Sequence, residues 1–232
     1  MPSTPDLRVM ASAAFKEAYL ELVALFEQKT GHRIHTTWVS SVEIIKNLKA
    51  GVATDLIVLA AQSIDELIMA QKLAAGSRQD LDTSYVAVAV RQGDSPIDVS
   101  STETLKKALL EAPSIAYSTG PSGVYLVELF KQLGLSSAIA HKVQEIKGEP
   151  VGAVVARGEA SIGFQQMCEL LPVPGIHIVG PLPQSIEKIT TFSTGRHVHC
   201  QNVALADQLS AFFKSPDSHA IIRSKGMDPI AL

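Results

Sequence analysis

Short apolar runs alternate with segments of helical periodicity through the first third of the chain, and this alternation constrains the fold more than any other feature. The runs at 7–11, 32–39 and 55–61 are rich in aliphatic or β-branched residues, which predicts buried strands. Each run is followed by an amphipathic segment that ends at a glycine, as many helices do. Because no hairpin turn joins the runs, we expect parallel strands connected through helices.

A second α/β unit is predicted in the middle of the chain. Its expected strands lie at 84–93, 114–118, 160–166, 176–183 and 188–198, and its expected helices at 102–112, 123–134, 136–143, 150–159 and 167–171. The chain closes on two helical stretches, at 202–215 and 218–227. A helical tail needs a sheet to pack on, so we expect it to return to the first unit. This predicts lobe 1 at 1–83 and 197–232, lobe 2 at 84–196, and a hinge near 84–92 and 188–197.

The composition excludes several classes of protein. The chain has 232 residues, is 46% hydrophobic and 19% charged, and carries a net charge of −3, so it can bury a core and is not basic enough for general nucleic-acid binding. Its two cysteines, Cys168 and Cys200, stand in no zinc-type cluster, and whether they pair stays open. No apolar run is long enough to span a membrane. We expect a periplasmic protein whose signal sequence has been removed, or a cytoplasmic one if Met1 is the native start.

The loop 118–123, Ser-Thr-Gly-Pro-Ser-Gly, lies between a predicted strand and a predicted helix. Ligands of open α/β sheets bind beyond the carboxyl ends of the strands, and the free N–H groups of a helix start favour an anion there. Pro121 suits the first helical position, where its missing N–H costs nothing. A capped turn without a ligand is the alternative, and we favour an anion cradle.

Motifs of the common enzyme classes are missing from the sequence. It contains no Gly-x-Ser-x-Gly elbow, phosphate-binding loop, HExxH helix or dinucleotide fingerprint. No sequence motif therefore supports a hydrolase, a kinase or a dehydrogenase. His197 and His199 are two residues apart, but no third ligand is near them in the sequence. We therefore expect no metal site and no cofactor. An isomerase needs only a placed acid and base with anchors for the substrate, and is not excluded.

Five stretches of the chain resemble a known family in order and spacing. They read LRVMASAAFKEAYLELVALFEQKTG, SSVEIIKNLKAG, TDLIVLAAQS, IAYSTGPSGVY and PVGAVVARGEASIGF. They resemble the molybdate-binding branch of the type II periplasmic solute-binding proteins, and the resemblance covers nearly the whole chain. It implies a two-lobed α/β fold in which each lobe is a mainly parallel sheet flanked by helices. Two crossing strands would join the lobes, and an anion would be held in the cleft at helix N-termini.

The sequence departs from this branch at ligand positions. The serine expected two places beyond Ser12 is Ala14, the tyrosine after the second-lobe strand is Gln166, and the valine before the Gly-Ala helix start is Pro150. The serine of the second helix corresponds to Ser41, and the loop position to Ser122. Because two hydroxyl donors are replaced, we expect that molybdate is not a tight ligand.

The resemblance also assigns candidate residues to the helix starts and strand ends that face the cleft. The expected substrate-binding residues are Ser12, Ala13, Ala14, Trp38, Ser40, Ser41, Ser118, Thr119, Gly120, Ser122, Gly123, Val124, Pro150, Gln165 and Gln166. The candidates for proton transfer are Lys16, Ser41, Tyr117 and Ser122. A further expectation is that a bulky side chain at Gly123 weakens anion binding and leaves the fold intact.

The motifs YSTGPSG, GFQQ and TTFS resemble a sub-branch of this family, and the chain resembles the aconitate isomerases of the fold in length and type. The resemblance implies a small organic polycarboxylate as ligand and its cofactor-independent isomerisation by allylic proton transfer. The alternative is a non-catalytic binding protein, a monomer that delivers an organic anion or oxyanion to a membrane permease of the ABC type. A third interpretation, the effector domain of a LysR-type regulator, is weakened because no helix-turn-helix precedes residue 7.

Overall fold

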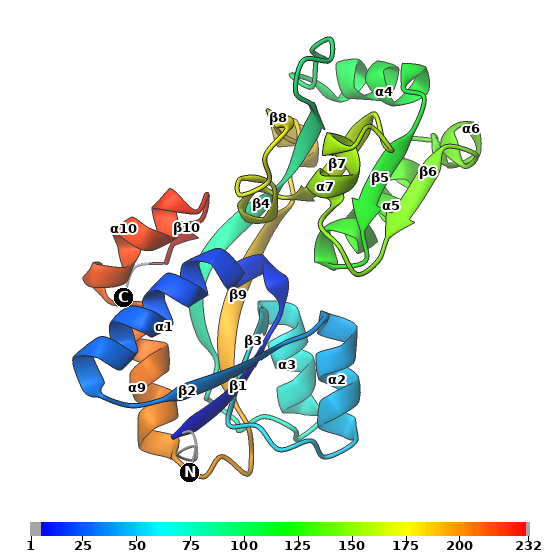
Figure 1. Cartoon of the computed structure of the whole chain (residues 1–232). Coiled ribbons are helices and arrows are strands. Elements are labelled where there is room, and N and C mark those ends of the chain that lie inside the picture. Colours follow the sequence, from blue (N-terminus) through cyan, green and yellow to red (C-terminus); the bar gives the residue numbers. More distant parts are fainter. Residues whose placement is uncertain (1–5, 231–232) are drawn as a thin grey trace. The chain divides into compact units, whose positions relative to one another are not determined.

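A computed structural model describes residues 6–230, which form two compact units (Figure 1). Unit 1 consists of Met1–Thr83 and Thr190–Leu232, and unit 2 of Ser84–Ile189. The chain therefore returns to unit 1 at 189/190, where the sequence had placed the return at 196/197. The reason is that strand β9 (Ile189–Arg196) pairs from Phe192 to Arg196 with a strand of unit 1.

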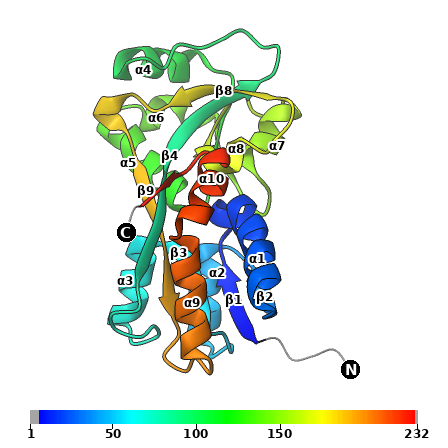
Figure 2. The same ribbon diagram turned by 90° about the vertical axis from the view of Figure 1, so that its left-hand side faces the viewer.

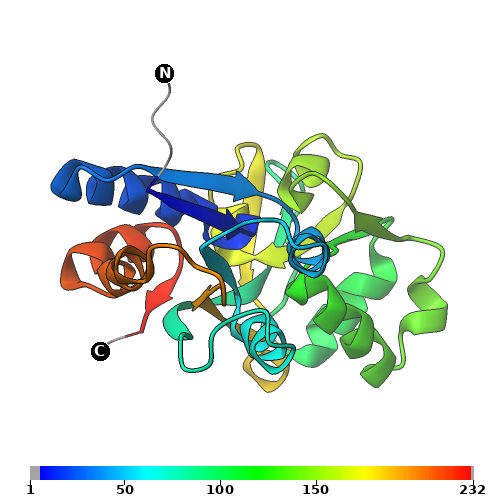
Figure 3. The same ribbon diagram turned by 90° about the horizontal axis from the view of Figure 1, so that it is seen from below.

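Unit 1 is a sheet with helices on both faces. Its strand order is β2-β1-β3-β9-β4, and β10 pairs with β4. The strands besides β9 are β1 (Leu7–Ala11), β2 (Ile34–Trp38), β3 (Leu56–Ala60), the first part of β4 (Gln79–Arg91) and β10 (Asp228–Pro229). The helices are α1 (Lys16–Thr30), α2 (Ser41–Lys49), α3 (Ala61–Met69), α9 (Val203–Phe213) and α10 (Pro216–Ser224). β1 is parallel to β2 and β3, as predicted, whereas β9 runs antiparallel to β3. Figure 3 shows β1 and β2 side by side.

Successive side chains of each strand point to opposite faces of the unit 1 sheet, and helices pack on both faces. Met10 and Ile57 point to one face, where Ile44 of α2 and Ile64 of α3 complete an apolar cluster. On the other side, the ring of Phe15, which directly precedes α1, meets that of Phe213 of α9 at 5.7 Å, edge to face. The predicted return of the helical tail to this unit is thus seen in the structure, with α9 and α10 packed against α1 (Figure 2).

Unit 2 is also a sheet flanked by helices, and it is formed by one continuous segment, Ser84–Ile189. Its strand order is β4-β7-β5-β6, and β8 pairs with β4. The strands are the second part of β4, β5 (Ile115–Ser118), β6 (Val143–Ile146), β7 (Ile162–Gln166) and β8 (Ile176–Pro181). The helices are α4 (Thr102–Glu111), α5 (Pro121–Gln132), α6 (Ser136–Ile139), α7 (Val151–Ala156) and α8 (Met167–Leu170). β5 is parallel to β6 and β7, and β4 is antiparallel to β7 and β8.

The two faces of the unit 2 sheet carry different helices. Phe164 of β7 joins the cluster formed with α4 and α5, and its ring lies 6.3 Å from that of Phe130. Ala116 of β5 packs instead against Val151 and Val155 of α7. The carboxyl ends of β5 and β7 are neighbours in register, so the starts of α5, α7 and α8 lie at one edge of this sheet.

Three elements differ from the sequence prediction. The helix predicted at 136–143 was wrong: it ends at Ile139, and Val143–Ile146 is the edge strand β6. β6 has only four residues, which is too short for an alternating pattern to predict a strand. β4 begins at Gln79, five residues earlier than predicted. The prediction missed its first part because Asp80 and Asp82 interrupt the apolar pattern there. The short strand β10 was not predicted at all.

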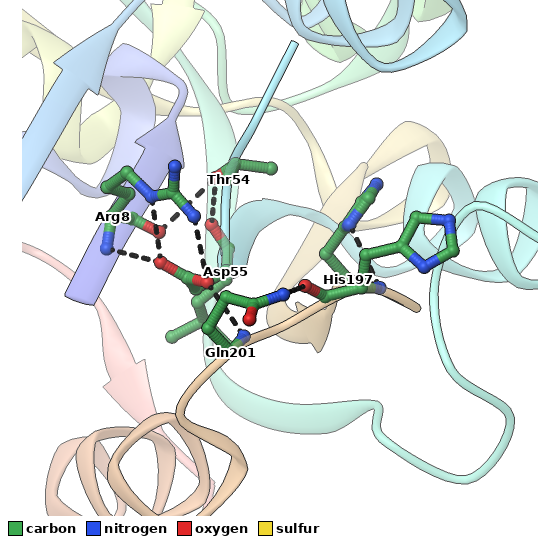
Figure 4. Close-up of polar contacts among 7 residues, drawn as sticks. Arg8, Thr54, Asp55, His197 and Gln201 are labelled. Atoms are coloured by element: carbon green, nitrogen blue, oxygen red, sulfur yellow. Dashed lines mark hydrogen bonds and ion pairs between the residues drawn. The ribbon is translucent and has the colours of Figure 1, made fainter. Parts of the chain in front are cut away.

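A carboxylate holds the amino ends of the unit 1 strands together (Figure 4). The Asp55 carboxylate accepts from the backbone N–H of Arg8 at 2.9 Å, from its guanidinium Nε at 3.2 Å, and from the backbone N–H of Gln201 at 3.2 Å. In the same turn the Nδ1 of His197 accepts from the backbone N–H of His199 at 3.2 Å. These histidines therefore serve a structural turn, at the end of the sheet opposite to the carboxyl ends of β1 and β3.

Candidate functional site

The carboxyl end of β1 leads into a turn of 3-10 helix before α1 begins. Ser12 precedes this turn, Ala13–Phe15, and its hydroxyl makes no capping hydrogen bond. Ser12 is the N-cap of this turn, and α1 continues from it at Lys16. Ala13 is exposed and Ala14 is half-buried, so both lie at the surface of the strand end. The turn presents backbone N–H groups and a buried serine at the place predicted for ligand binding.

Lys16 and Trp38 lie together at the same edge of unit 1. Trp38 ends β2 opposite Ala11 of β1, and the Lys16 ammonium sits 5.6 Å from the centre of its ring. The ring of Tyr19 also packs against Trp38, at 5.1 Å and edge to face. Lys16 is half-buried and forms no ion pair with a carboxylate anywhere in residues 6–230. A half-buried cation without an acidic partner is suited to a bound anion.

The two serines at the start of α2 have different roles. Ser40 is the N-cap, and its hydroxyl accepts from the backbone N–H of Glu43 at 3.2 Å. Ser41 is the first helical residue and is half-buried. The structure thus assigns the capping role to Ser40 and leaves the hydroxyl of Ser41 as the candidate for a ligand.

The predicted cradle of unit 2 is the start of α5. Gly120 is the N-cap, with Pro121 at the first helical position. The hydroxyls of Ser118 and Ser122 are hydrogen-bonded at 3.0 Å, and Ser122 is almost fully buried while Ser118 and Thr119 are half-buried. Ser118 is therefore the hydroxyl within reach of a ligand, and Ser122 orients it.

Gly123 permits this turn, because a Cβ at this position would lie 1.6 Å from the backbone oxygen of Ser118. The expectation that a bulky side chain here leaves the fold intact was wrong, since the backbone itself blocks the space. Val124, the next residue, is 70% exposed and stands at the surface of the helix start.

Tyr117 precedes the loop and is half-buried at the end of β5. Burial, helped by the nearby Glu145 carboxylate, raises the pKa of its phenol above the ordinary value. The phenol is therefore protonated at neutral pH and can donate a proton or a hydrogen bond, but it is a poor base.

The glutamines at the end of β7 are buried rather than solvated. Gln165 Oε1 accepts from the backbone N–H of Val151 at 2.8 Å, so it caps α7, whose N-cap is Pro150. Gln166 is 1% exposed and is the N-cap of α8. The role of these two residues in substrate binding stays a prediction, and the single side-chain oxygen of Gln165 is already occupied by the Val151 N–H.

Sequence reasoning missed Glu169, the third residue of α8. Burial raises the pKa of its carboxyl to about 7, and hydrogen bonds from the Gln165 side chain and the Gln166 backbone only partly offset this effect. Glu169 is the third residue of α8 and accepts from the backbone N–H of the N-cap Gln166, which is half of a capping box, but the N-cap serine or threonine that would mark this pattern in the sequence is absent.

Within residues 6–230 no group of three or more His, Cys, Asp or Glu side chains is arranged to hold a metal ion. Cys200 carries a free thiol, so it is not part of a disulfide. In the same part of the chain, no helix is both long and apolar enough to cross a membrane.

Comparison with known proteins places the chain in a family. Residues 7–228 match the family of bacterial extracellular solute-binding proteins. The chain is 35% identical to aconitate isomerase from Pseudomonas sp., over 97% of this chain and 88% of that protein. It is 24% identical to the molybdate-binding protein ModA of Escherichia coli K12, over 95% of this chain and 88% of that protein. The periplasmic molybdate-binding protein of Azotobacter vinelandii has the same fold, with a TM-score of 0.79 at 20% identity, covering 96% of this chain and 98% of that one.

These matches confirm the predicted fold class and the predicted resemblance to the molybdate-binding branch of type II periplasmic binding proteins. The helix starts at the carboxyl ends of the strands in both units agree with an anion-binding member of that branch. The chain belongs to the bacterial extracellular solute-binding protein family.

Proposed function

We propose that this protein binds a small organic polycarboxylate and interconverts cis- and trans-aconitate. The observation that carries the proposal is the 35% identity, over 97% of the chain, to an aconitate isomerase. The departures at Ala14 and Gln166, where hydroxyl donors are expected for molybdate, support a carbon ligand over an oxyanion.

Unit 1 offers a cation and hydroxyls suited to carboxylates. The Lys16 ammonium is held over Trp38 and has no acidic partner in the described chain. A charge-assisted hydrogen bond to a carboxylate is roughly twice as strong as a neutral one. Ser12 and Ser41 belong to the same unit, and each lies at the start of a helical segment that follows a strand. We assign Lys16 as a carboxylate anchor.

Unit 2 offers neutral donors at the start of a helix of twelve residues. The N–H groups of the first turn of α5 and the Ser118 hydroxyl can bind a carboxylate, and they can stabilise the enolate-like charge of an intermediate. Such preorganised donors need no reorganisation as the charge develops.

The reaction is redox-neutral and needs no added group. A base removes a proton from the methylene carbon of aconitate, and the electron pair of that bond forms a new double bond to the central carbon. The old double bond opens as its former vinyl carbon takes up a proton. Because the carbon skeleton is symmetric under this shift, the product is aconitate again, with the new double bond in the cis or trans arrangement. We propose that the protein performs this step in the periplasm as a monomer, without a metal or cofactor.

The test is turnover by the purified protein after treatment with a chelator. Proton NMR of trans-aconitate should show the appearance of the cis isomer, and heat-inactivated protein should show none. Binding of citrate, molybdate and both aconitates is measured in parallel by calorimetry. If neither isomer is converted while one of them binds, the protein is a receptor. Sub-micromolar binding of molybdate would contradict the choice of ligand.

The second candidate function is a receptor that delivers its ligand to a membrane permease. It is favoured by the similarity to a molybdate-binding protein along 95% of the chain. Both functions require the same anion site, so binding alone does not distinguish them, whereas turnover does.

Replacing Ser118 by Ala should weaken aconitate binding about tenfold to a hundredfold, because a hydrogen bond to a charged group contributes roughly 1.5–3 kcal/mol. Ser122→Ala should weaken it less, since Ser122 acts by orienting Ser118 at 3.0 Å. The exposed Ser137 provides the control, as Ser137→Ala should leave affinity unchanged. Calorimetry with equal affinity for Ser118→Ala and wild type would show that the loop is only a turn.

A further inference from the structure

Glu169 lies where the strand that ends the unit 2 site turns into a helix. β7 ends at Gln166, and Glu169 is the third residue of α8, which begins immediately afterwards. The residue is half-buried as a whole, and its carboxyl group lies in a buried environment. Within the described residues 6–230 it forms no ion pair with a lysine, arginine or histidine. It is thus an acidic side chain without a cationic partner at the edge of the sheet where the α5 cradle also begins.

A chain of hydrogen bonds fixes this carboxyl. The backbone N–H of Val151 donates to Gln165 Oε1 at 2.8 Å, and the Gln165 side chain in turn donates to Glu169. The backbone N–H of Gln166 is a second donor to Glu169. Since the start of α7 occupies the Gln165 oxygen, the Gln165 amide group is turned with its N–H groups toward Glu169. The carboxyl is therefore oriented by two neutral donors.

The surroundings of Glu169 are uncharged. β7 and α7 carry no charged side chain, and Leu170 beside it belongs to an apolar cluster with Ala87 and Ala89. Of the other strands of unit 2, the part of β4 from residue 84 to 91 carries Tyr85 and Arg91, and Arg91 pairs with Asp94 at 2.8 Å. β8 carries the exposed His177.

This setting favours proton transfer at neutral pH. Burial raises the pKa of Glu169 to about 7. The carboxylate and the carboxylic acid are then both populated near pH 7, which is the condition under which a group can take a proton and return it.

We propose that Glu169 is the proton-transfer residue of the isomerisation, with Gln165 as the residue that positions it; this inference rests on the function proposed above. The Glu169 carboxylate takes the proton from the methylene carbon of aconitate as the new double bond forms. The resulting carboxylic acid returns a proton to the former vinyl carbon, so the carboxylate is regenerated and no atom or electron is gained or lost. Of the residues considered for this role from the sequence, Lys16 becomes an anchor of the substrate, and Ser122 contributes by orienting Ser118.

A structural role for Glu169 also exists, since its carboxyl caps α8 through the Gln166 N–H. Glu169→Gln separates the two roles, because a glutamine at this position still accepts the capping hydrogen bond but cannot carry the proton. Turnover number should fall by at least about a hundredfold, the lower end of the usual contribution of a general base. The dissociation constant of trans-aconitate should change by less than about threefold, since anchoring is left in place.

Two further variants sharpen the test. Glu169→Asp keeps the carboxyl and should recover part of the activity lost in Glu169→Gln. Glu103, an exposed acid in the first turn of α4, gives the control, and Glu103→Gln should keep wild-type turnover. All variants are compared by thermal unfolding and circular dichroism, so that loss of structure is not read as loss of chemistry.

The pH dependence of turnover also separates the two roles, because it depends on Glu169 only if this residue transfers the proton. For wild type, turnover should rise with pH through a limb near pH 7 as Glu169 becomes ionised, and this limb should be absent from the residual activity of Glu169→Gln. If Glu169→Gln keeps wild-type turnover, Glu169 is only a cap and the isomerase proposal stands. If wild type itself converts neither isomer, both proposals fail together.

Discussion

Gly123→Ala should destabilise the protein by more than about 3 kcal/mol, which is the upper end of the usual cost of overpacking. An added Cβ would lie 1.6 Å from the Ser118 carbonyl oxygen and 2.9 Å from the Tyr117 ring. The nearest of these atoms is backbone, so no side-chain rotation relieves the clash, and the start of α5 has to move away from the end of β5. Urea unfolding gives the free energy, and we expect a lower midpoint with loss of aconitate binding.

The matched control is Gly120→Ala in the same loop. Gly120 has an ordinary negative φ of −78°, and a Cβ there would meet only the Ser118 hydroxyl at 3.6 Å, which is normal contact. This variant should unfold at nearly the wild-type midpoint. Equal midpoints for both variants would mean that the loop tolerates a side chain at Gly123 and that the close approach of the two backbones is not required.

Asp82→Asn should make the protein more stable at neutral pH. Asp82 is fully buried on β4, and neither carboxyl oxygen has a hydrogen-bond partner within residues 6–230. Burial therefore raises the pKa of Asp82 well above its ordinary value. The folded state holds a proton that the unfolded state releases above about pH 4, so this group lowers stability as pH rises.

The size of the effect follows from the same linkage. Wild type and Asp82→Asn should be equally stable near pH 3, where both side chains are neutral. Above about pH 4 the variant should gain roughly 1.4 kcal/mol over wild type per pH unit, up to the pKa of the buried acid. Urea unfolding from pH 3 to pH 8 measures the difference. Parallel curves for the two proteins would show that Asp82 is ionised or solvated in the folded state.

Asp80 is a control of opposite sign on the same strand. Burial acts to raise its pKa, but hydrogen bonds from Arg78 at 2.7 Å and from Ser193 at 2.6 Å outweigh this, so the pKa of Asp80 is lowered. Its ionised form stabilises the fold above the unfolded pKa, and this contribution is lost as the pH falls through the folded pKa. Asp80→Asn should therefore be less stable than wild type at neutral pH, and the deficit should shrink in acid.

The fold was largely predictable because periodicity reports burial directly. The fully buried run at 56–60 and the helix ended by Gly31 in a left-handed conformation were both visible in the sequence. Strands were missed where tertiary pairing rather than pattern creates them. Val143–Ile146 is a strand because β5 offers its edge, and the start of β4 is a strand although Asp80 and Asp82 interrupt its apolar pattern.

The site was predictable in position but not in the roles of its side chains. The loop before α5 was found because small residues and a proline at a strand end have a physical meaning. That Ser40 is a cap and Gln165 holds the start of α7 depends on partners that only the folded chain brings within reach. Glu169 was missed for the same reason, since an acid in a short helix resembles any solvated one until its burial is known.

The division of unit 1 into two segments has a consequence for the order in which a newly made chain can fold. Residues 84–189 contain every strand and helix of unit 2, so this unit can form as soon as they have been synthesised. β3, in contrast, waits for β9 on one edge, and Phe15 and Tyr19 wait for Phe213. Phe15 and Tyr19 are therefore made before unit 2 but enclosed only after it, and a chain that stops short of Phe213 lacks the ring against which both of them pack.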